Sequence, residues 1–140
     1  MILYLETSDL VKLYAEESDS NVISGRVQAA DIVATSILSY AEARAALSRK
    51  SREKGIDEKE YQRVKTELDM DWEHYFILNL TNDLVKSAGD LAEKHALRGF
   101  DALHLASAVA INRLTSLPVT FSSSDARLRS AAQDEGLTMA

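Results

Sequence analysis

Four acidic residues, Glu6, Glu42, Asp101 and Asp125, lie far apart in the sequence but in similar surroundings. Each lies in a strongly apolar segment, where a strand gives way to a helix or where a helix begins. Carboxylates gathered beside a hydrophobic core repel one another and lose hydration, and a bound cation is the usual compensation. Oxygen ligands from Asp and Glu suit hard ions such as Mg²⁺ or Mn²⁺. The pattern therefore indicates metal-assisted hydrolysis, most often of a phosphodiester.

Three of the acids also have a purely structural interpretation. Glu42 completes a capping-box pattern with the serine three residues before it. Asp101 and Asp125 lie in first helical turns, where an acid gains about 0.3–1 kcal/mol from the helix dipole. Glu6 directly follows the apolar run at 2–5 and has no capping role, so its burial would be costly without a cation.

Other polar residues near these acids have two interpretations each. Ser8 and Ser123 either cap helices or hold a metal-bound water or a ligand. Asp9 is interpreted as a charge at the start of a helix rather than as a ligand. His104 lies one helical turn after Asp101 and is interpreted as a hydrogen-bonded core residue rather than as a base or a ligand.

The composition limits the class of protein. A chain of 140 residues indicates one domain, residues 1–140. Cysteine is absent, which excludes disulfides and thiolate metal sites and fits a reducing compartment. The sequence contains neither a signal-peptide pattern nor an apolar run of membrane-spanning length. We therefore expect a cytoplasmic protein with no membrane contact.

The net charge of −6 is unusual for a nucleic-acid-binding protein. Without the four candidate ligands, 18 acidic residues face 16 basic ones, and the net charge becomes −2. Divalent ions bound in the same cleft would add positive charge there. The acidic balance therefore weakens the hypothesis of nucleic-acid binding without excluding it, and it also suits a basic protein partner.

Hydrophobic periodicity predicts an alternation of strands and helices. Short apolar runs predict strands at 2–5, 32–35, 75–80 and 118–121. Helical spacing predicts helices at 8–17, 21–30, 37–50, 57–72, 83–96, 100–114 and 124–135. This order is typical of an α/β fold with a mostly parallel central sheet covered on both faces. Such sheets bind ligands beyond the carboxyl ends of their strands, where the four acids would converge.

Four segments resemble the motifs of the PIN-domain family. They are MILYLETSDLVKLYAEE, SILSYAEARAAL, LRGFDALHLASAVA and TFSSSDARLRSAAQDEGL. The third is a close match, and the resemblance covers essentially the whole chain. One residue departs from the family pattern, because the first acid is usually Asp and is Glu6 in this chain. The length and the single-domain layout look most like VapC toxins of prokaryotic toxin–antitoxin pairs.

The resemblance implies a three-layer α/β/α fold and a Mg²⁺- or Mn²⁺-dependent endoribonuclease that uses metal-activated water. By position, Glu6, Glu42, Asp101 and Asp125 match the catalytic and metal-binding acids, and Ser8 and Ser123 match supporting hydroxyl groups. It further implies an RNA substrate, a cognate antitoxin that places a basic side chain in the acidic site, and a homodimer. The helix at 37–50 and the hairpin that follows offer apolar surface for either protein contact.

RNA binding would need cations near the acidic cleft. The candidates closest in sequence to the acids are Arg44, Arg98 and Arg127. A different hypothesis keeps the fold but not the activity: Glu6 impairs the metal site, and the protein is a non-catalytic PIN-like module that binds RNA or protein. In a third hypothesis the acids serve only as helix caps, which predicts no rise in melting temperature with metal.

Overall fold

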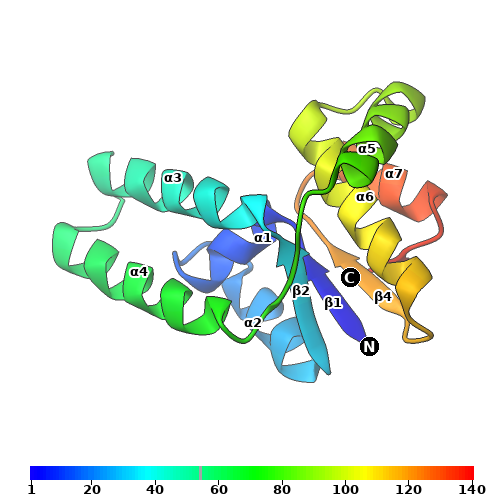
Figure 1. Ribbon diagram of the computed structural model, residues 1–140. Helices are drawn as coiled ribbons and strands as arrows, with labels where there is room; N and C mark the ends of the chain where they lie inside the picture. The colour runs from blue at the N-terminus through cyan, green and yellow to red at the C-terminus, as the bar shows by residue number, and fades with distance from the viewer. Residues whose placement is uncertain (54) are drawn as a thin grey trace.

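A single sheet of five parallel strands organises the computed structural model, which describes residues 1–53 and 55–140. The strand order is β3-β2-β1-β4-β5. The central neighbours β1 and β4 come from opposite ends of the chain (Figure 1). The strands are β1 (Ile2–Leu5), β2 (Ile32–Ser36), β3 (Phe76–Leu78), β4 (Val119–Ser122) and β5 (Thr138–Met139). The predicted parallel α/β architecture is confirmed.

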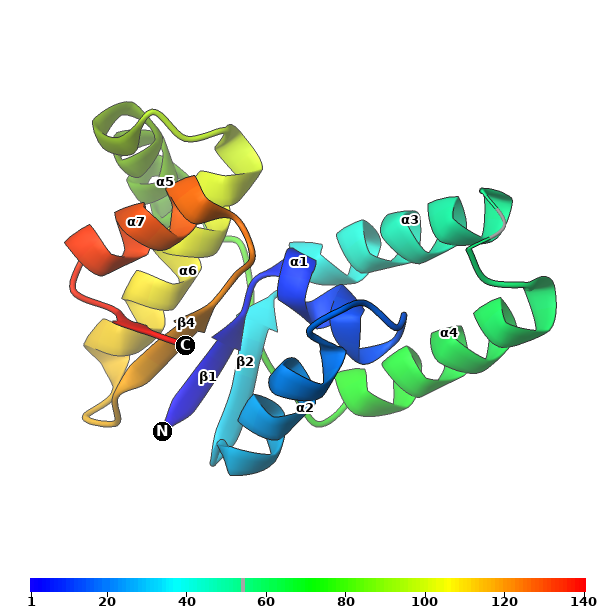
Figure 2. The same ribbon diagram turned by 180° about the vertical axis from the view of Figure 1, so that it is seen from behind.

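Helices cover both faces of this sheet. On one side lie α1 (Thr7–Leu10), the 3₁₀ turn η1 (Val11–Leu13), α2 (Ser20–Ala29) and the hairpin of α3 (Leu38–Arg52) and α4 (Glu58–Trp72). On the other lie α5 (Asn82–His95), α6 (Gly99–Leu114) and α7 (Ala126–Asp134), as Figures 1 and 2 show. Within the described ranges, none of these helices is long and apolar enough to cross a bilayer.

The residues of the first strand explain why helices cover both faces of the sheet. All four residues of β1 are buried. Leu3 and Leu5 pack into the core beside α1 to α4, whereas Ile2 and Tyr4 pack against α6 and α7. Alternate side chains of a strand point to opposite faces, so a strand covered on both faces needs a continuous apolar run. The three-layer α/β/α arrangement follows directly from this pattern.

The first helix is shorter than predicted. Helical spacing favoured 8–17, but α1 ends at Leu10 and the chain continues only as the single turn η1. Tyr14 closes that turn, and its hydroxyl group bonds to Asp71 at 2.9 Å and to Tyr75 at 2.6 Å. These bonds dock the segment against the end of α4, so tertiary contacts override the local helical preference.

Strand β5 was not predicted, because two residues give no periodic signal. Gly136 turns the chain into it with a φ of 87°, a backbone conformation that favours glycine. Ala140 N then donates to Phe121 O at 3.0 Å. The C-terminal residues thus close the sheet beside β4.

Candidate functional site

The sheet brings the acid-bearing segments to one edge. Glu6 directly follows β1, and its backbone N–H donates to Ser122 O at the end of β4 at 3.0 Å. Asp125 follows β4 by three residues. Glu42 lies in the second turn of α3, which follows β2, and Asp101 lies in the first turn of α6. Figure 1 shows the carboxyl ends of β1 and β2 leading into the starts of α1 and α3.

Glu6 is held by two serine hydroxyl groups. Its side chain is only 7% exposed. Ser123 Oγ donates to Glu6 Oε2 at 2.8 Å, and Ser8 Oγ donates to the same oxygen. Ser8 Oγ also accepts a bond from Ser124 N at 3.0 Å. The two serines proposed from the motifs therefore contact the first acid and tie the β1–α1 segment to the β4–α7 loop.

Glu42 is held by a different pair of donors. Thr7 Oγ1 donates to Glu42 Oε1 at 2.7 Å, and His104 Nε2 lies 2.8 Å from the same oxygen. Burial raises the pKa of Glu42, but the hydrogen bonds from His104 and Thr7 outweigh burial and hold that pKa below its ordinary value. The capping-box interpretation is wrong, because α3 begins after Ile37 without a side-chain cap and Glu42 bonds to other elements.

The negative charges of Asp101 and Asp125 repel each other. Burial raises the pKa of Asp101, and the negative charges of Asp125 and Glu42 raise it further, while His104 and Arg98 oppose the rise. Asp125 also caps α7, because its Oδ1 accepts a bond from Leu128 N at 2.9 Å. Asp125 is thus the N-cap of α7 rather than a residue of its first turn, and the cap occupies only one of its two oxygens.

The chemistry of this donor set fits a hard cation. Four carboxylates from four segments approach one sheet edge, and mutual repulsion is already expressed in the pKa of Asp101. Among residues 1–53 and 55–140, no three His, Asp or Glu side chains are already drawn together in a geometry that would hold one ion. Mg²⁺ usually keeps several waters and takes only one or two carboxylates from a protein. The arrangement is compatible with that mode of binding.

Asp9 belongs to a buried network that sequence reasoning missed. It is 1% exposed, and the hydroxyl groups of Ser122 and Ser124 donate to its two oxygens. Lys12 Nζ and Arg26 Nη1 lie 3.6 and 3.7 Å from the carboxylate. Asp9 lies in the first turn of α1, as the sequence predicted, but it is also a buried acid that two cations and two hydroxyl groups surround. The one signal in the sequence was the lysine three residues later.

The three candidate arginines differ in whether they already bond within the protein. Arg44 lies over the Tyr40 ring at 5.7 Å and donates to the Tyr40 hydroxyl at 2.9 Å, inside the α3–α4 hairpin. Arg127 donates to Ala96 O at 3.2 Å. Arg98 is exposed directly before α6, and its charge acts on Asp101. Only Arg98 is thus exposed and electrostatically coupled to a candidate acid.

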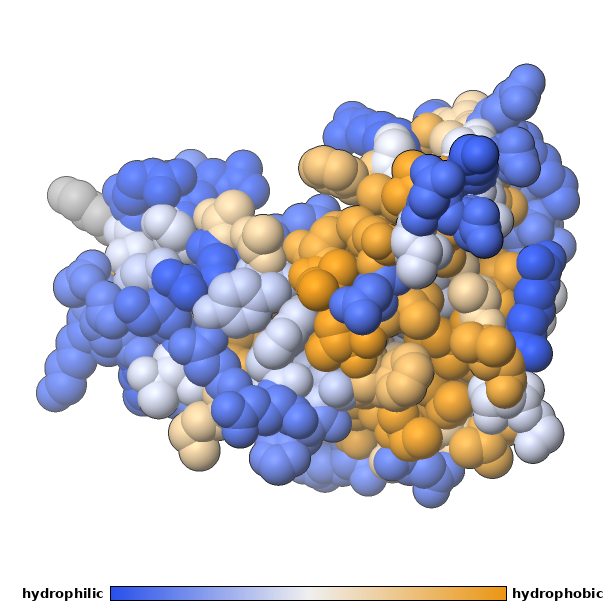
Figure 3. Space-filling view, in the orientation of Figure 1, coloured by the Kyte–Doolittle hydropathy of each residue, from blue (hydrophilic) through white to orange (hydrophobic). Residues whose placement is uncertain are grey.

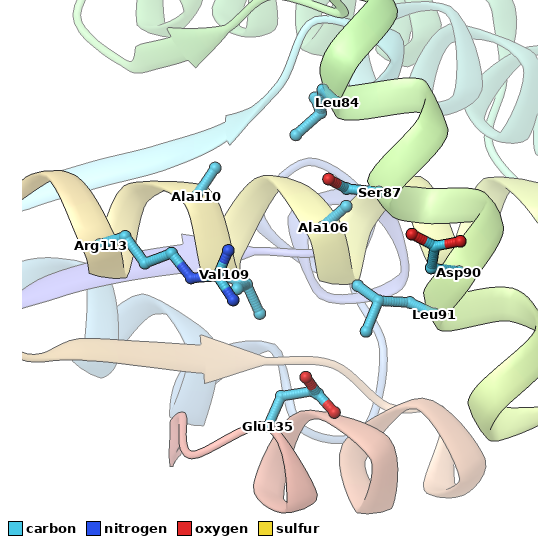
Figure 4. Close-up of a pocket in the computed structure, with 9 residues that line it drawn as sticks. All are labelled: Leu84, Ser87, Asp90, Leu91, Ala106, Val109, Ala110, Arg113 and Glu135. Atoms are coloured by element: carbon cyan, nitrogen blue, oxygen red, sulfur yellow. The ribbon is translucent and has the colours of Figure 1, made fainter.

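A groove of about 530 Å³ adjoins the acids. Its wall includes Thr7, Ser8 and Ser124, which neighbour the acids, and it continues along Lys12, Arg49 and Lys50. A separate hollow of about 230 Å³ lies between α5, α6 and α7, where Leu84, Val109, Arg113 and Glu135 point inward (Figure 4). None of the four acids lines either the groove or the hollow. The groove lies beside the acids, because Thr7 and Ser8 on its wall donate hydrogen bonds to Glu42 and Glu6.

The PIN domain family model matches residues 3–133. The chain belongs to the PIN domain family. Ribonuclease VapC45 of Mycobacterium tuberculosis is 37% identical over 114 residues, which are 79% of this chain and 76% of that protein. The family motifs thus extend over most of this PIN domain rather than over one local segment.

Solved structures share the fold of this PIN domain. FitAcB from Neisseria gonorrhoeae superposes with a TM-score of 0.72 at 15% identity, covering 99% of this chain and 96% of that one. A toxin–antitoxin complex from Klebsiella pneumoniae superposes with a TM-score of 0.61 at 17% identity, covering 84% and 83%. At these identities the likeness concerns the fold alone.

Proposed function

We propose that this PIN domain is a cytoplasmic endoribonuclease and the toxin of a toxin–antitoxin pair. The observation that carries the proposal is the hydrogen-bonded linkage of the four acid-bearing segments: Ser123 links the Glu6 and Asp125 segments, and Thr7 and His104 link those of Glu42 and Asp101. The 37% identity to a VapC ribonuclease supports the same activity.

Glu6, Glu42, Asp101 and Asp125 are proposed to hold Mg²⁺ or Mn²⁺. When bound, such an ion activates water for attack on phosphorus and stabilises the developing charge. The residues of the chain provide the fixed geometry. Ser8 and Ser123 orient Glu6, and Thr7 and His104 orient Glu42. The repulsion between Asp101 and Asp125 favours cation uptake, since a divalent charge nearby would offset it.

RNA is proposed to enter along the groove beside the acids. Arg49 is exposed on its wall, and Lys12 and Lys50 lie on the same wall although both also pair with carboxylates. Arg98 approaches from the α6 side. Phosphate contacts of this kind position a nucleic acid without reading its sequence. Arg44 and Arg127 are kept as weaker candidates, because both already bond within the protein.

An antitoxin partner is proposed for the same acidic edge. The net charge of −6 and the unsatisfied repulsion around Asp101 suit a basic segment of another protein. Such a side chain would compete with the cation for the same carboxylates. The solved toxin–antitoxin complex of the same fold supports this partner class.

A homodimer is proposed through an apolar face. Figure 3 shows apolar side chains gathered over β3, α5 and α6. Exposed members include Phe76 at 49%, Val85 at 48% and Leu114 at 78%. Helix α3, which the sequence suggested for this contact, turns its apolar residues Ala43 and Leu47 into the core instead. A second copy covering the β3–α5–α6 face would remove this surface from water.

The proposal is tested by incubating a mixed RNA pool with the wild type and Asp101→Asn, in Mg²⁺, in Mn²⁺ and in EDTA. Cleavage should need the metal and fall about 100-fold or more in the variant, since even outer-shell partners of a metal contribute 10–100-fold. Asp83→Asn is the matched control, because Asp83 lies in the first turn of α5 and is exposed. Metal-independent cleavage, or full activity in Asp101→Asn, would contradict the proposal.

One observation keeps a second function open. Glu6 replaces the Asp that usually occupies the first family position. If folded, antitoxin-free wild type binds RNA but cleaves none of it with either metal, the non-catalytic binding module becomes the better description.

A further inference from the structure

Tyr4 and His104 form a buried polar pair directly behind Glu42. Their exposed fractions are 0% and 1%. The Tyr4 hydroxyl lies 2.9 Å from His104 Nδ1, and His104 Nε2 lies 2.8 Å from Glu42 Oε1. The Tyr4 ring is itself fixed, because it stacks on Phe121 with 5.5 Å between ring centroids. A continuous chain of bonds therefore runs from the core to a candidate ligand.

The direction of the hydrogen bonds to Glu42 follows from the chemistry of the groups. A carboxylate only accepts, so His104 Nε2 carries a proton and donates it to Glu42 Oε1. Thr7 also donates its only hydroxyl proton to that oxygen, so Thr7 Oγ1 is the acceptor in its 3.1 Å contact with Nε2. The other ring nitrogen, Nδ1, bonds to the Tyr4 hydroxyl, and this contact fixes the orientation of the imidazole.

The two carboxylate oxygens of Glu42 therefore differ in their hydrogen bonding. Within the described ranges, its side-chain hydrogen bonds all fall on Oε1. Glu42 is 29% exposed, so without these bonds its three side-chain torsions would sample several rotamers. Donors from α1 and α6 fix one oxygen toward the interior and leave Oε2 free for the acidic site.

We propose that His104 and Tyr4 are positioning residues that act through Glu42: they turn Oε1 inward, present Oε2 to the cation, and so set the cation affinity of the site. The inference rests on the proposed function, because it assigns Glu42 as a ligand. Outer-shell partners that orient a ligating carboxylate typically change metal affinity or activity 10–100-fold. His104 is thus more than the hydrogen-bonded core residue that the sequence indicated.

The test measures Mn²⁺ affinity by calorimetry and RNA cleavage for the wild type and three variants. His104→Ala should weaken both by about 10–100-fold. His104→Gln should recover most of each loss, since its side-chain amide supplies an N–H donor near the position of Nε2. Tyr4→Phe should give an intermediate loss, because the imidazole keeps its bond to Glu42 but loses the bond that orients the ring.

A matched control is available on the other side of α6. His95 Nε2 lies 2.8 Å from Glu135 Oε2, and the His95 side chain is 10% exposed. His95→Ala therefore removes a similar His–Glu contact that involves none of the four acids, and it should leave Mn²⁺ affinity unchanged. A loss of affinity in this control equal to that in His104→Ala would show a general packing effect and overturn the inference.

The remaining outcomes are distinct. Wild-type Mn²⁺ affinity in folded His104→Ala overturns the inference but leaves the proposed function intact. Lost cleavage with unchanged Mn²⁺ affinity, not recovered by glutamine, assigns His104 a structural role and also overturns it. If His104→Ala does not fold, Tyr4→Phe decides, and unchanged affinity there refutes the inference. A wild type without Mn²⁺ affinity removes the proposed function itself.

Discussion

Ser123 Oγ donates a hydrogen bond to Glu6 Oε2 at 2.8 Å, although 117 residues separate them along the chain. The bond is possible because β1 and β4 are direct neighbours with Leu5 opposite Ser122. Ser8 donates to the same oxygen. The longer side chain at this family position is therefore anchored on one side, which reduces the freedom that an additional methylene gives to Glu6.

The first prediction concerns Glu6. Glu6→Asp should retain or raise cleavage, because Asp is the usual first acid of the family and remains an oxygen ligand. Glu6→Gln should abolish cleavage, since the substitution removes the negative charge that a metal ligand supplies. Initial rates in Mg²⁺ and Mn²⁺ provide the measurement, with the exposed Glu16→Gln as control. Full activity in Glu6→Gln would remove Glu6 from the ligand set.

Asp101 should limit the stability of the metal-free protein. Its folded-state pKa is raised by burial and by Asp125, so its contribution to stability is present below its ordinary pKa of 3.8 and is lost as pH rises through the folded-state value. At neutral pH in EDTA, Asp101→Asn should therefore melt higher, by at most roughly 2–4 °C, since solvent screens the partly exposed carboxylate. The difference should shrink in acid and with Mn²⁺. A lower melting temperature at pH 7 would contradict the carboxylate repulsion.

We expect the buried Asp9 network to stabilise the folded protein and to take no part in catalysis. Asp9→Asn weakens the bonds from Ser122 and Ser124 and leaves two nearby cations without their anion, so we expect a loss of about 1–3 kcal/mol in unfolding free energy. Chemical denaturation measures it. Asp31→Asn is the control, because Asp31 is 70% exposed and its ion pair with the N-terminus should contribute nothing measurable.

Arg98 and Arg44 should respond differently to replacement by alanine. Arg98→Ala should weaken RNA binding and reduce its salt dependence, because an exposed guanidinium near the acids is lost. Arg44→Ala should mainly lower the melting temperature, since Arg44 packs on Tyr40 within the hairpin. Binding titrations at two salt concentrations, alongside thermal melts, separate the two effects. Equal loss of RNA affinity in both variants would refute this assignment.

The proposed dimer is tested at Leu114, which is 78% exposed on the β3–α5–α6 face. Leu114→Glu should shift the protein to monomer in sedimentation, because a charge would be buried against the second copy. Met70→Glu on α4 is the control, since Met70 is 64% exposed outside that face. A wild type that sediments as a monomer at high concentration refutes the dimer outright.

Much of the fold could be predicted from the sequence, because buried parallel strands are continuous apolar runs. The runs 2–5, 32–35 and 118–121 coincide closely with β1, β2 and β4, and 75–80 contains β3. The parallel order then placed Glu6 and Asp125 at one edge. Strand β5 escaped prediction because it depends on pairing with β4 rather than on its own pattern.

Contacts across the layers could not be predicted. The bond between His104 and Glu42 joins residues 62 positions apart, on helices α6 and α3 that cover opposite faces of the sheet, so it exists only once both layers are assembled. Asp9 resembled an ordinary helix-start charge because its partners Ser122 and Ser124 lie at the other end of the chain. Local patterns report which face is buried, whereas side-chain pairing depends on how those faces meet.

The adjacency of β1 and β4 has a consequence for biosynthesis. A nascent chain that has emerged only as far as residue 118 lacks β4, Ser123 and Asp125, so the first acid has neither its serine partner nor its neighbouring strand. For a toxic nuclease, this order of synthesis means that translation products ending before residue 119 cannot assemble the site. Toxicity would begin only after residues 119–125 have left the ribosome.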